Sequence, residues 1–171
     1  LLDTMLQHGV YRFILSSTCA TFGIPEHLPI TEDAPQLPIN PYGRTKLAAE
    51  NAILDAASAG NLDAVILRYF NAAGADPQGE TGEEHDPETH LIPNALKAAV
   101  GLGGPMKLFG NDYPTPDGTC IRDFIHVTDL AEAHILAANR LAAGSGNLQL
   151  NLGSGNRNTV LEVLQAVERA T

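Results

Sequence analysis

The sequence lacks several features that would assign it to a common functional class. No apolar run approaches the about 18 residues that a membrane-spanning helix needs. The only two cysteines, Cys19 and Cys120, have no Cys-x-x-Cys spacing, so we expect neither a disulfide framework nor a zinc site but reduced thiols in a cytoplasmic protein. Lys and Arg number 10 against 20 Asp and Glu, and the net charge of −10 argues against nucleic acid as a partner, because phosphate binding needs a basic surface.

A glycine-rich dinucleotide fingerprint is also missing. No strand-like run is followed by Gly-x-Gly-x-x-Gly or Gly-x-x-Gly-x-x-Gly. The glycines at 101–104 follow an expected helix rather than a strand. Gly153-Ser154-Gly155 does follow an expected strand, but it lacks the full motif and we interpret it as a tight turn.

The rest of the sequence is that of a folded α/β chain. Hydrophobic residues make up 44% and charged residues 18%, which is typical of a globular protein. Short apolar runs alternate with amphipathic stretches, a pattern that favours βαβ units and a mainly parallel sheet. Expected strands cover residues 10–15, 64–69, 107–109 and 148–152, and expected helices cover 42–59, 91–100 and 129–141. The intervening loops at 24–41 and 71–89 are long, and loops of that length are often functional.

Both ends of the sequence have a helical pattern. Residues 1–8 have the pattern of the last turns of a helix without an N-cap, and residues 159–171 that of an amphipathic helix without a stop signal. This predicts a piece of a longer protein. A compact domain with frayed ends is the alternative.

Tyr42 and Lys46 form the main candidate for a reactive pair. Their spacing places them one turn apart on the same face of the helix expected after Pro41. A phenol is a poor base at neutral pH, and a nearby ammonium favours its ionised form, so such a pair can exchange protons in an alcohol–ketone interconversion. Thr18 closes a Ser-Ser-Thr segment at the carboxyl end of the first strand, where open α/β sheets bind ligands. A solvated helix face is the alternative for the pair taken alone.

A second group of polar residues lies at 83–90, where Glu83, Glu84, His85, Asp86 and His90 could suggest a metal site. The stretch contains Asp86-Pro87 and lacks the helical His-Glu-x-x-His spacing. We therefore interpret it as a solvated acidic loop and expect no metal.

Several segments together resemble the extended short-chain dehydrogenase/reductase family. They are ILSST (14–18), FG (22–23), PYGRTK (41–46) and LRYFN (67–71). A longer and more specific pair, FGNDYPTPDGT (109–119) followed by RDFIHV (122–127), resembles the UDP-glucose 4-epimerase branch of that family. The resemblance covers essentially the whole chain without large gaps.

The resemblance implies roles for individual positions. Tyr42 would be the catalytic base, Lys46 would hold the nicotinamide ribose and tune Tyr42, and Thr18 would shuttle the proton of the sugar 4-hydroxyl while contacting both cofactor and substrate. Phe70 matches a position near the nicotinamide. The further substrate-binding positions that it implies are Asn71, His90, Leu91, Lys107, Leu108, Phe109 and Arg122.

The resemblance also implies the fold and the activity. Residues 1–70 would form the C-terminal half of an NAD-binding Rossmann domain, and 71–171 mostly a UDP-sugar-binding region, with 129–152 returning to the Rossmann core. The implied reaction is NAD-dependent interconversion of UDP-glucose and UDP-galactose through a 4-keto sugar, in a homodimer, with this chain inactive alone. Another extended short-chain dehydrogenase acting on a nucleotide sugar, and a non-catalytic remnant or interaction module, are the alternatives. A dehydratase ranks lower, because Cys19 and Ala20 follow Thr18 where dehydratases carry an Asp-Glu pair.

Overall fold

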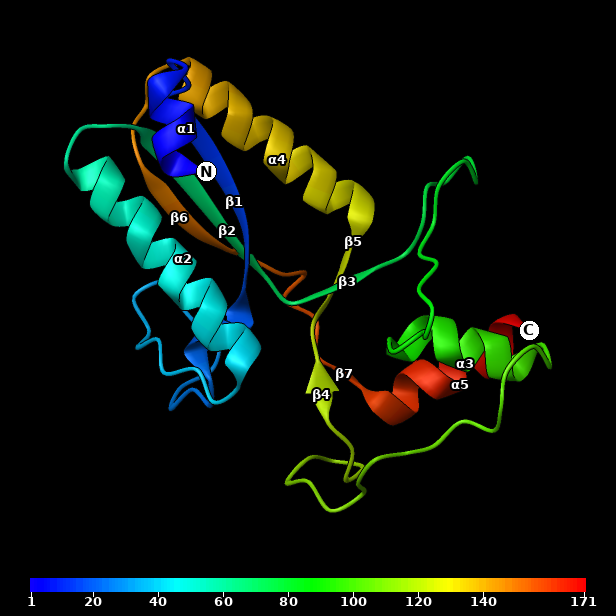
Figure 1. Ribbon diagram of the computed structural model, residues 1–171. Coiled ribbons are helices and arrows are strands. Elements are labelled where there is room, and N and C mark those ends of the chain that lie inside the picture. Colours follow the sequence, from blue (N-terminus) through cyan, green and yellow to red (C-terminus); the bar gives the residue numbers. More distant parts are fainter. The chain divides into compact units, whose positions relative to one another are not determined.

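The computed structural model describes residues 1–171, which fold into two compact units. The first unit comprises residues 1–70 and 129–153, and the second comprises 71–128 and 154–171. Figure 1 labels the helices and strands of both. No helix combines the length and the apolar character that crossing a bilayer requires.

The first unit is built on a three-stranded parallel sheet. Its strands are β1 (Arg12–Thr18), β2 (Asp63–Tyr69) and β6 (Leu148–Leu152), in the order β1-β2-β6. The middle strand is buried on both faces, which explains its nearly continuous apolar sequence from residue 64 to 67. The register pairs Thr18 with Tyr69 and Tyr69 with Leu152, so the carboxyl ends of all three strands lie at one edge of the sheet.

Helices cover both faces of this sheet (Figure 1). Helix α2 (Pro41–Ser58) packs Ile53 and Ala57 against Ala64, together with α1 (Leu2–Gln7). Helix α4 (Val127–Ala142) packs Ala137 and Leu141 against the opposite face of β2. Neighbouring residues of a strand point to opposite faces, so the alternation along β2 determines which helix each side chain meets.

The start of α2 is defined by its cap and by a close approach to β1. The Asn40 side chain accepts a hydrogen bond from the Gly43 N–H at 2.7 Å, and Pro41 occupies the first turn, where it removes no helical hydrogen bond. A Cβ atom at Gly43 would lie 2.5 Å from the carbonyl oxygen of Ala20, in the short 3₁₀ helix η1 (Cys19–Phe22) that follows β1. Glycine at this position therefore lets α2 approach the end of the strand.

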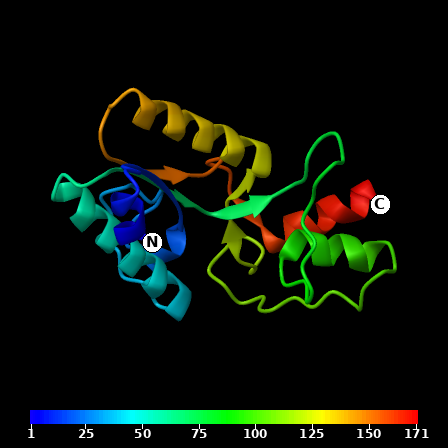
Figure 2. The same cartoon turned by 45° about the horizontal axis from the view of Figure 1, so that its top comes forward.

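The second unit has two small sheets and two helices. Strand β3 (Asn71–Ala73) pairs in parallel with β5 (Phe124–His126), and β4 (Ile121–Arg122) pairs antiparallel with β7 (Asn158–Thr159). Helices α3 (Leu91–Ala99) and α5 (Val160–Ala170) lie side by side in both ribbon views (Figures 1 and 2). A capping box between Thr159 and Glu162 begins α5.

The turn at 153–155, expected from the sequence, is held by a carboxylate of the second unit. Asp123 accepts hydrogen bonds from the backbone N–H and the hydroxyl of Ser154 at 2.9 and 2.8 Å, and from the Gly155 N–H at 3.0 Å. With an acidic side chain as its partner, this turn does not present its N–H groups to a phosphate.

Two sequence-based expectations about the second unit were wrong. Residues 107–109 form no strand and belong to none of the sheets. Conversely, residues 71–73, expected in a loop, form β3 because β5 pairs with them. Short strands of this kind exist only through pairing with a distant segment.

Candidate functional site

Three of the predicted reactive residues lie in the first unit, around the carboxyl end of β1. Thr18 is the last residue of the strand and is 7% exposed, and its hydroxyl oxygen accepts a hydrogen bond from the Ala20 N–H at 3.1 Å. Lys46 Nζ donates to the Ser16 carbonyl oxygen at 2.9 Å, two residues before Thr18. Gly43, beside Tyr42, meets Ala20 two residues after Thr18. The first turns of α2 thus flank the strand end on both sides of Thr18.

The Tyr42 phenol is the most accessible member of this group. The residue is 54% exposed, and its hydroxyl makes no hydrogen bond within the chain. The Lys46 ammonium lies 5.9 Å from the centre of the Tyr42 ring. This arrangement leaves the phenol oxygen able to exchange a proton with a ligand, beside a fixed positive charge that stabilises negative charge on that oxygen.

A histidine that the sequence analysis did not single out also reaches this strand end. His134 of α4 places Nε2 2.8 Å from the Ser16 hydroxyl and Nδ1 2.7 Å from the Leu130 carbonyl oxygen. A carbonyl only accepts, so Nδ1 carries a proton, and in the neutral imidazole Nε2 accepts from the Ser16 hydroxyl. Ser16 therefore links α4 through its side chain to α2 through its carbonyl and Lys46.

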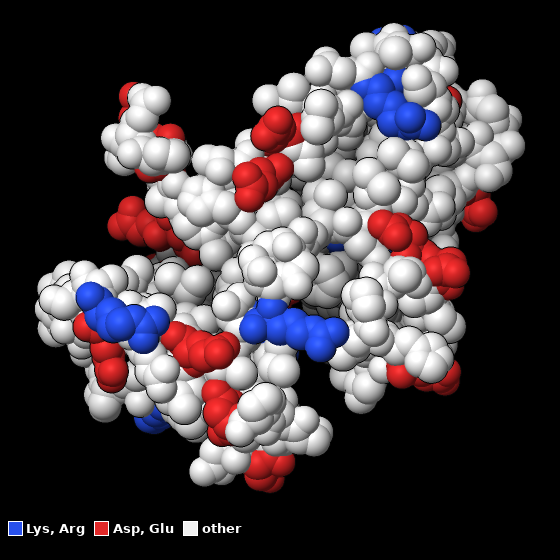
Figure 3. Space-filling model, turned by 180° about the vertical axis from the view of Figure 1, so that it is seen from behind, with Lys and Arg blue, Asp and Glu red and all other residues white.

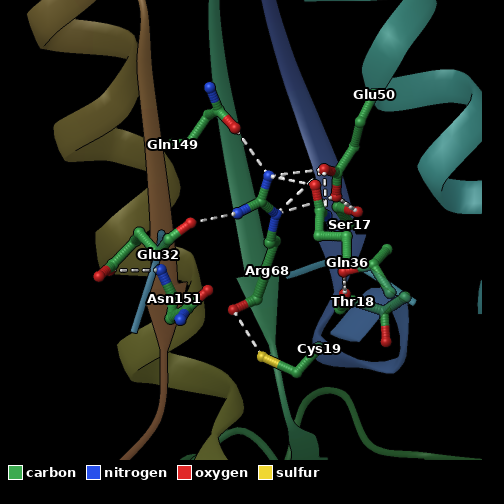
Figure 4. Close-up of polar contacts among 10 residues, drawn as sticks. Ser17, Thr18, Cys19, Glu32, Gln36, Glu50, Arg68, Gln149 and Asn151 are labelled. Atoms are coloured by element: carbon green, nitrogen blue, oxygen red, sulfur yellow. Dashed lines mark hydrogen bonds and ion pairs between the residues drawn. The ribbon is translucent and has the colours of Figure 1, made fainter. Parts of the chain in front are cut away.

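A buried ion pair anchors α2 one turn beyond Lys46. Glu50 is fully buried and pairs with Arg68 of β2, whose Nη2 lies 2.7 Å from the Glu50 Oε2. The Arg68 Nε also donates to the same carboxylate, at 3.0 Å to Oε2. The hydroxyl of Ser17, the neighbour of Thr18, donates a hydrogen bond to Glu50 as well. Figure 4 shows Arg68 reaching from β2 to the carboxylate on α2.

Two glutamines complete the polar network around Arg68 (Figure 4). Gln149 of β6 accepts from the Arg68 Nη2 at 2.7 Å. Gln36, in the loop before α2, accepts from the same nitrogen at 3.3 Å and donates to Glu50 at 2.9 Å. The pair is therefore desolvated but well supplied with hydrogen bonds, the condition under which a buried ion pair is tolerated.

The spacing of these residues gives the network a geometric consequence. Tyr42, Lys46 and Glu50 are four residues apart in turn, so they lie along one face of α2. Glu50 ties that face to β2, and Lys46 ties it to β1. Two contacts with two different strands fix the rotation of the helix about its axis, and with it the direction of Tyr42.

The predicted substrate-binding residues lie in the second unit. The Asn71 side chain donates to the Asp123 carbonyl oxygen at 2.8 Å, and His90 is the N-cap residue of α3, directly before Leu91. Arg122 in β4 is exposed, and its Nη1 lies 3.3 Å from the Ile121 carbonyl oxygen. The three residues of the incorrectly predicted strand, Lys107, Leu108 and Phe109, are exposed, Phe109 at 82%.

Charge is unevenly distributed over the visible surface. On the face drawn in Figure 3, Lys and Arg form isolated patches among Asp and Glu. No continuous basic stripe crosses that face.

The residues of the first unit fit one end of a nicotinamide cofactor. An exposed phenol without a partner and a fixed ammonium are suitable donors for ribose hydroxyls, and both flank the strand end where α/β sheets bind nucleotides. Phe70 follows β2 at the same edge, with its N–H 3.4 Å from the Leu152 carbonyl oxygen. The 171 residues contain no glycine-rich loop for the pyrophosphate.

Comparison with known proteins gives consistent matches. The family model described as "NAD dependent epimerase/dehydratase family" matches residues 1–153. The UDP-glucose 4-epimerase of Rhizobium leguminosarum bv. trifolii is 52% identical over 171 residues, which are all of this chain and 52% of that protein. That of Rhizobium meliloti (strain 1021) is 53% identical over 169 residues, covering 99% of this chain and 52% of the relative.

Solved structures give the same result for the fold. The crystal structure of UDP-glucose 4-epimerase from Brucella ovis in complex with NAD superposes with a TM-score of 0.95 and 55% identity, covering 99% of this chain and 52% of that one. The enzyme from Bifidobacterium longum in complex with NAD+ and UDP gives a TM-score of 0.92 and 40% identity, covering 99% and 51%. The chain thus spans about half the length of the relatives it matches.

Proposed function

The chain belongs to the NAD dependent epimerase/dehydratase family, and from this premise we propose that the protein interconverts UDP-glucose and UDP-galactose. The observation that carries the proposal is the arrangement at the end of β1. The exposed Tyr42 phenol, the Lys46 ammonium held on the Ser16 carbonyl and the Thr18 hydroxyl surround one strand end. The similarity to UDP-glucose 4-epimerases over essentially the whole chain supports the choice of reaction.

In this proposal each residue of the group has one task. Tyr42 takes the proton of the sugar 4-hydroxyl and later returns it. Thr18 shares that hydroxyl and passes the proton to the Tyr42 oxygen. Lys46 stabilises the negative charge on Tyr42 and binds the ribose hydroxyls of the cofactor. When bound, NAD would supply the chemistry of accepting the hydride and giving it back, so the reaction would have no net redox change.

The nucleotide end of the substrate is assigned to the second unit. His90 and Leu91 begin α3, and the start of a helix attracts a phosphate because its first N–H groups have no partner within the helix. Arg122 provides a guanidinium, which binds phosphate oxygens in a bidentate way. Asn71 is assigned to the diphosphate, and Lys107, Leu108 and Phe109 to the uridine. A homodimer in the cytoplasm is part of the same proposal.

Other reactions of the family fit the strand end less well. Elimination of water from a sugar needs an acid next to Thr18. Here Cys19 and Ala20 occupy those positions, and Cys19 is buried. Epimerisation requires no such acid. A non-catalytic role remains the second candidate for the chain alone, since it has no glycine-rich loop.

Replacing the base tests the proposal. In the protein that contains this chain together with the glycine-rich NAD loop, we expect Tyr42→Phe to lower kcat for UDP-galactose roughly 10²–10⁴-fold, the usual contribution of a positioned acid–base group. Tyr11→Phe, which changes an exposed phenol at the other end of β1, is the matched control and leaves kcat unchanged. A loss below tenfold for Tyr42→Phe excludes Tyr42 as the base. Titration of NAD into the 171-residue chain tests whether the chain alone can act: without binding it is non-catalytic as it stands, whatever the longer protein does.

A further inference from the structure

Four potential metal ligands converge in the second unit, in the loop before α3. They are Glu83, His85, Glu88 and His90, and one donor atom from each lies within 4.8 Å of the others. Both imidazoles turn Nδ1 toward the Glu83 carboxylate. His85 Nδ1 lies 3.0 Å from the Glu83 Oε1, and His90 Nδ1 contacts the same oxygen. Each of these two nitrogens lies 3.8 Å from the Glu88 Oε1.

Glu88 provides an independent sign that a ligand is missing. Its side chain is only 4% exposed, and its Oε2 is buried without any hydrogen-bond partner. The other oxygen accepts from the N–H groups of Thr89 and His90, both at 2.9 Å. A buried carboxylate oxygen without a partner is costly, and a bound cation would remove that cost.

We propose that Glu83, His85, Glu88 and His90 bind a Zn²⁺ ion. Imidazole nitrogens and carboxylate oxygens are both ligands that Zn²⁺ uses in proteins, whereas Mg²⁺ and Ca²⁺ prefer oxygen ligands alone. In a tetrahedral site with bonds near 2.0–2.1 Å, neighbouring donors lie about 3.3 Å apart. The separations of 3.0 and 3.8 Å lie on either side of that value.

The ion would connect the loop to the start of α3. Glu83 and His85 come from the loop, while His90 is the N-cap residue of the helix. From the sequence, the same stretch was interpreted as a solvated acidic loop, because it contains Asp86-Pro87 and lacks the helical His-Glu-x-x-His spacing. His90 is also one of the residues assigned to the nucleotide of the substrate, but the measurements that test the zinc site involve neither NAD nor a sugar nucleotide.

Calorimetric titration of the 171-residue chain tests the site, with Zn²⁺ and Mg²⁺ as separate probes. We expect one Zn²⁺ per chain and much weaker binding of Mg²⁺. His85→Asn removes one ligand that is 56% exposed, and we expect Zn²⁺ affinity to fall at least tenfold. His27→Asn changes another exposed loop histidine and leaves the affinity unchanged. Circular dichroism checks that both variants are folded.

Cobalt gives a second readout of the same site. Co²⁺ added to the chain is expected to give the intense visible absorption of tetrahedral coordination, and His85→Asn to abolish it. Glu88→Gln retains an oxygen for the two N–H groups but loses the charge, and it should also weaken Zn²⁺ binding at least tenfold. Equal Zn²⁺ affinities for the wild type and His85→Asn, or equally tight binding of Mg²⁺, would overturn the proposal.

Discussion

Removing Arg68 from its buried pair is expected to be among the most damaging single changes in the first unit. Arg68 is 1% exposed and Glu50 is 0% exposed, so Arg68→Met leaves a carboxylate in the interior without its counter-charge. Such a change typically costs about 3–5 kcal/mol, which is a large part of the roughly 5–15 kcal/mol that stabilises an ordinary domain. The Ser17 and Gln36 hydrogen bonds to Glu50 remain, which places the expected loss nearer the lower value.

Urea unfolding followed by circular dichroism measures this loss. With a slope of about 2 kcal/mol per molar, a loss of about 3 kcal/mol lowers the midpoint by about 1.5 M. Arg44→Met, on the exposed surface of α2, is the matched control and should change stability by less than about 0.5 kcal/mol. The double variant Arg68→Met with Glu50→Leu removes both charges and should recover much of the loss, because no unpaired charge remains.

Two results would refute this reasoning. A loss below about 1 kcal/mol for Arg68→Met means that Glu50 is not desolvated as described. A double variant as unstable as the sum of the single variants means that the two side chains do not interact.

The remaining predictions concern one position in each unit. Gly43→Ala should destabilise the first unit by about 1–3 kcal/mol in urea unfolding, because the new Cβ would lie 2.5 Å from the Ala20 carbonyl oxygen. The same change should lower kcat, because it shifts Tyr42. Unchanged stability would contradict the close approach of α2 to Ala20. In the second unit, hydrogen bonds from the Thr159 hydroxyl and then from the Thr119 N–H hold the pKa of Asp117 below its ordinary value of 3.8. Because the pKa of Asp117 is lower in the folded than in the unfolded state, its charged carboxylate stabilises the fold at pH values above the unfolded-state pKa. This contribution is lost as the pH falls through the folded-state pKa. In urea titrations, the free energy of unfolding of the wild type should therefore exceed that of Asp117→Asn at pH 6, and this difference should shrink below about pH 4. A difference that does not change with pH would contradict the prediction.

The local elements were largely predictable because their signals are local. The apolar run at 64–69 predicted a buried strand, and β2 covers Asp63–Tyr69. Pro41 predicted the start of the long helix, which begins there with Asn40 as its cap. The first strand extends further than expected, through Ser16 and Ser17 to Thr18, because pairing with β2 outweighs the polar character of these residues.

The parallel α/β fold expected from the alternating pattern is confirmed by the sheet and by the solved relatives. Membership in the family is confirmed as well, since the model of the family covers residues 1–153. The roles of the individual site residues, and the assignment of residues 1–70 and 71–171 to cofactor and substrate, stay predictions. The geometry described above supports these predictions, and the experiments proposed for Tyr42 test the role of the base.

By itself, the sequence determined the main helices and the strands of the first sheet, and that Tyr42 and Lys46 share one helix face, because both follow from the period of a helix or a strand. Only the tertiary structure decided which distant side chains meet. Glu50 forms an ion pair with Arg68, 18 positions away in the sequence, and the Ser16 hydroxyl contacts the His134 ring, 118 positions away. The convergence of Glu83, His85, Glu88 and His90 was hidden for a related reason, since an irregular loop has no repeat from which side-chain directions can be read. Contacts of these kinds depend on how the backbone folds in space, and no periodic pattern in the sequence encodes that.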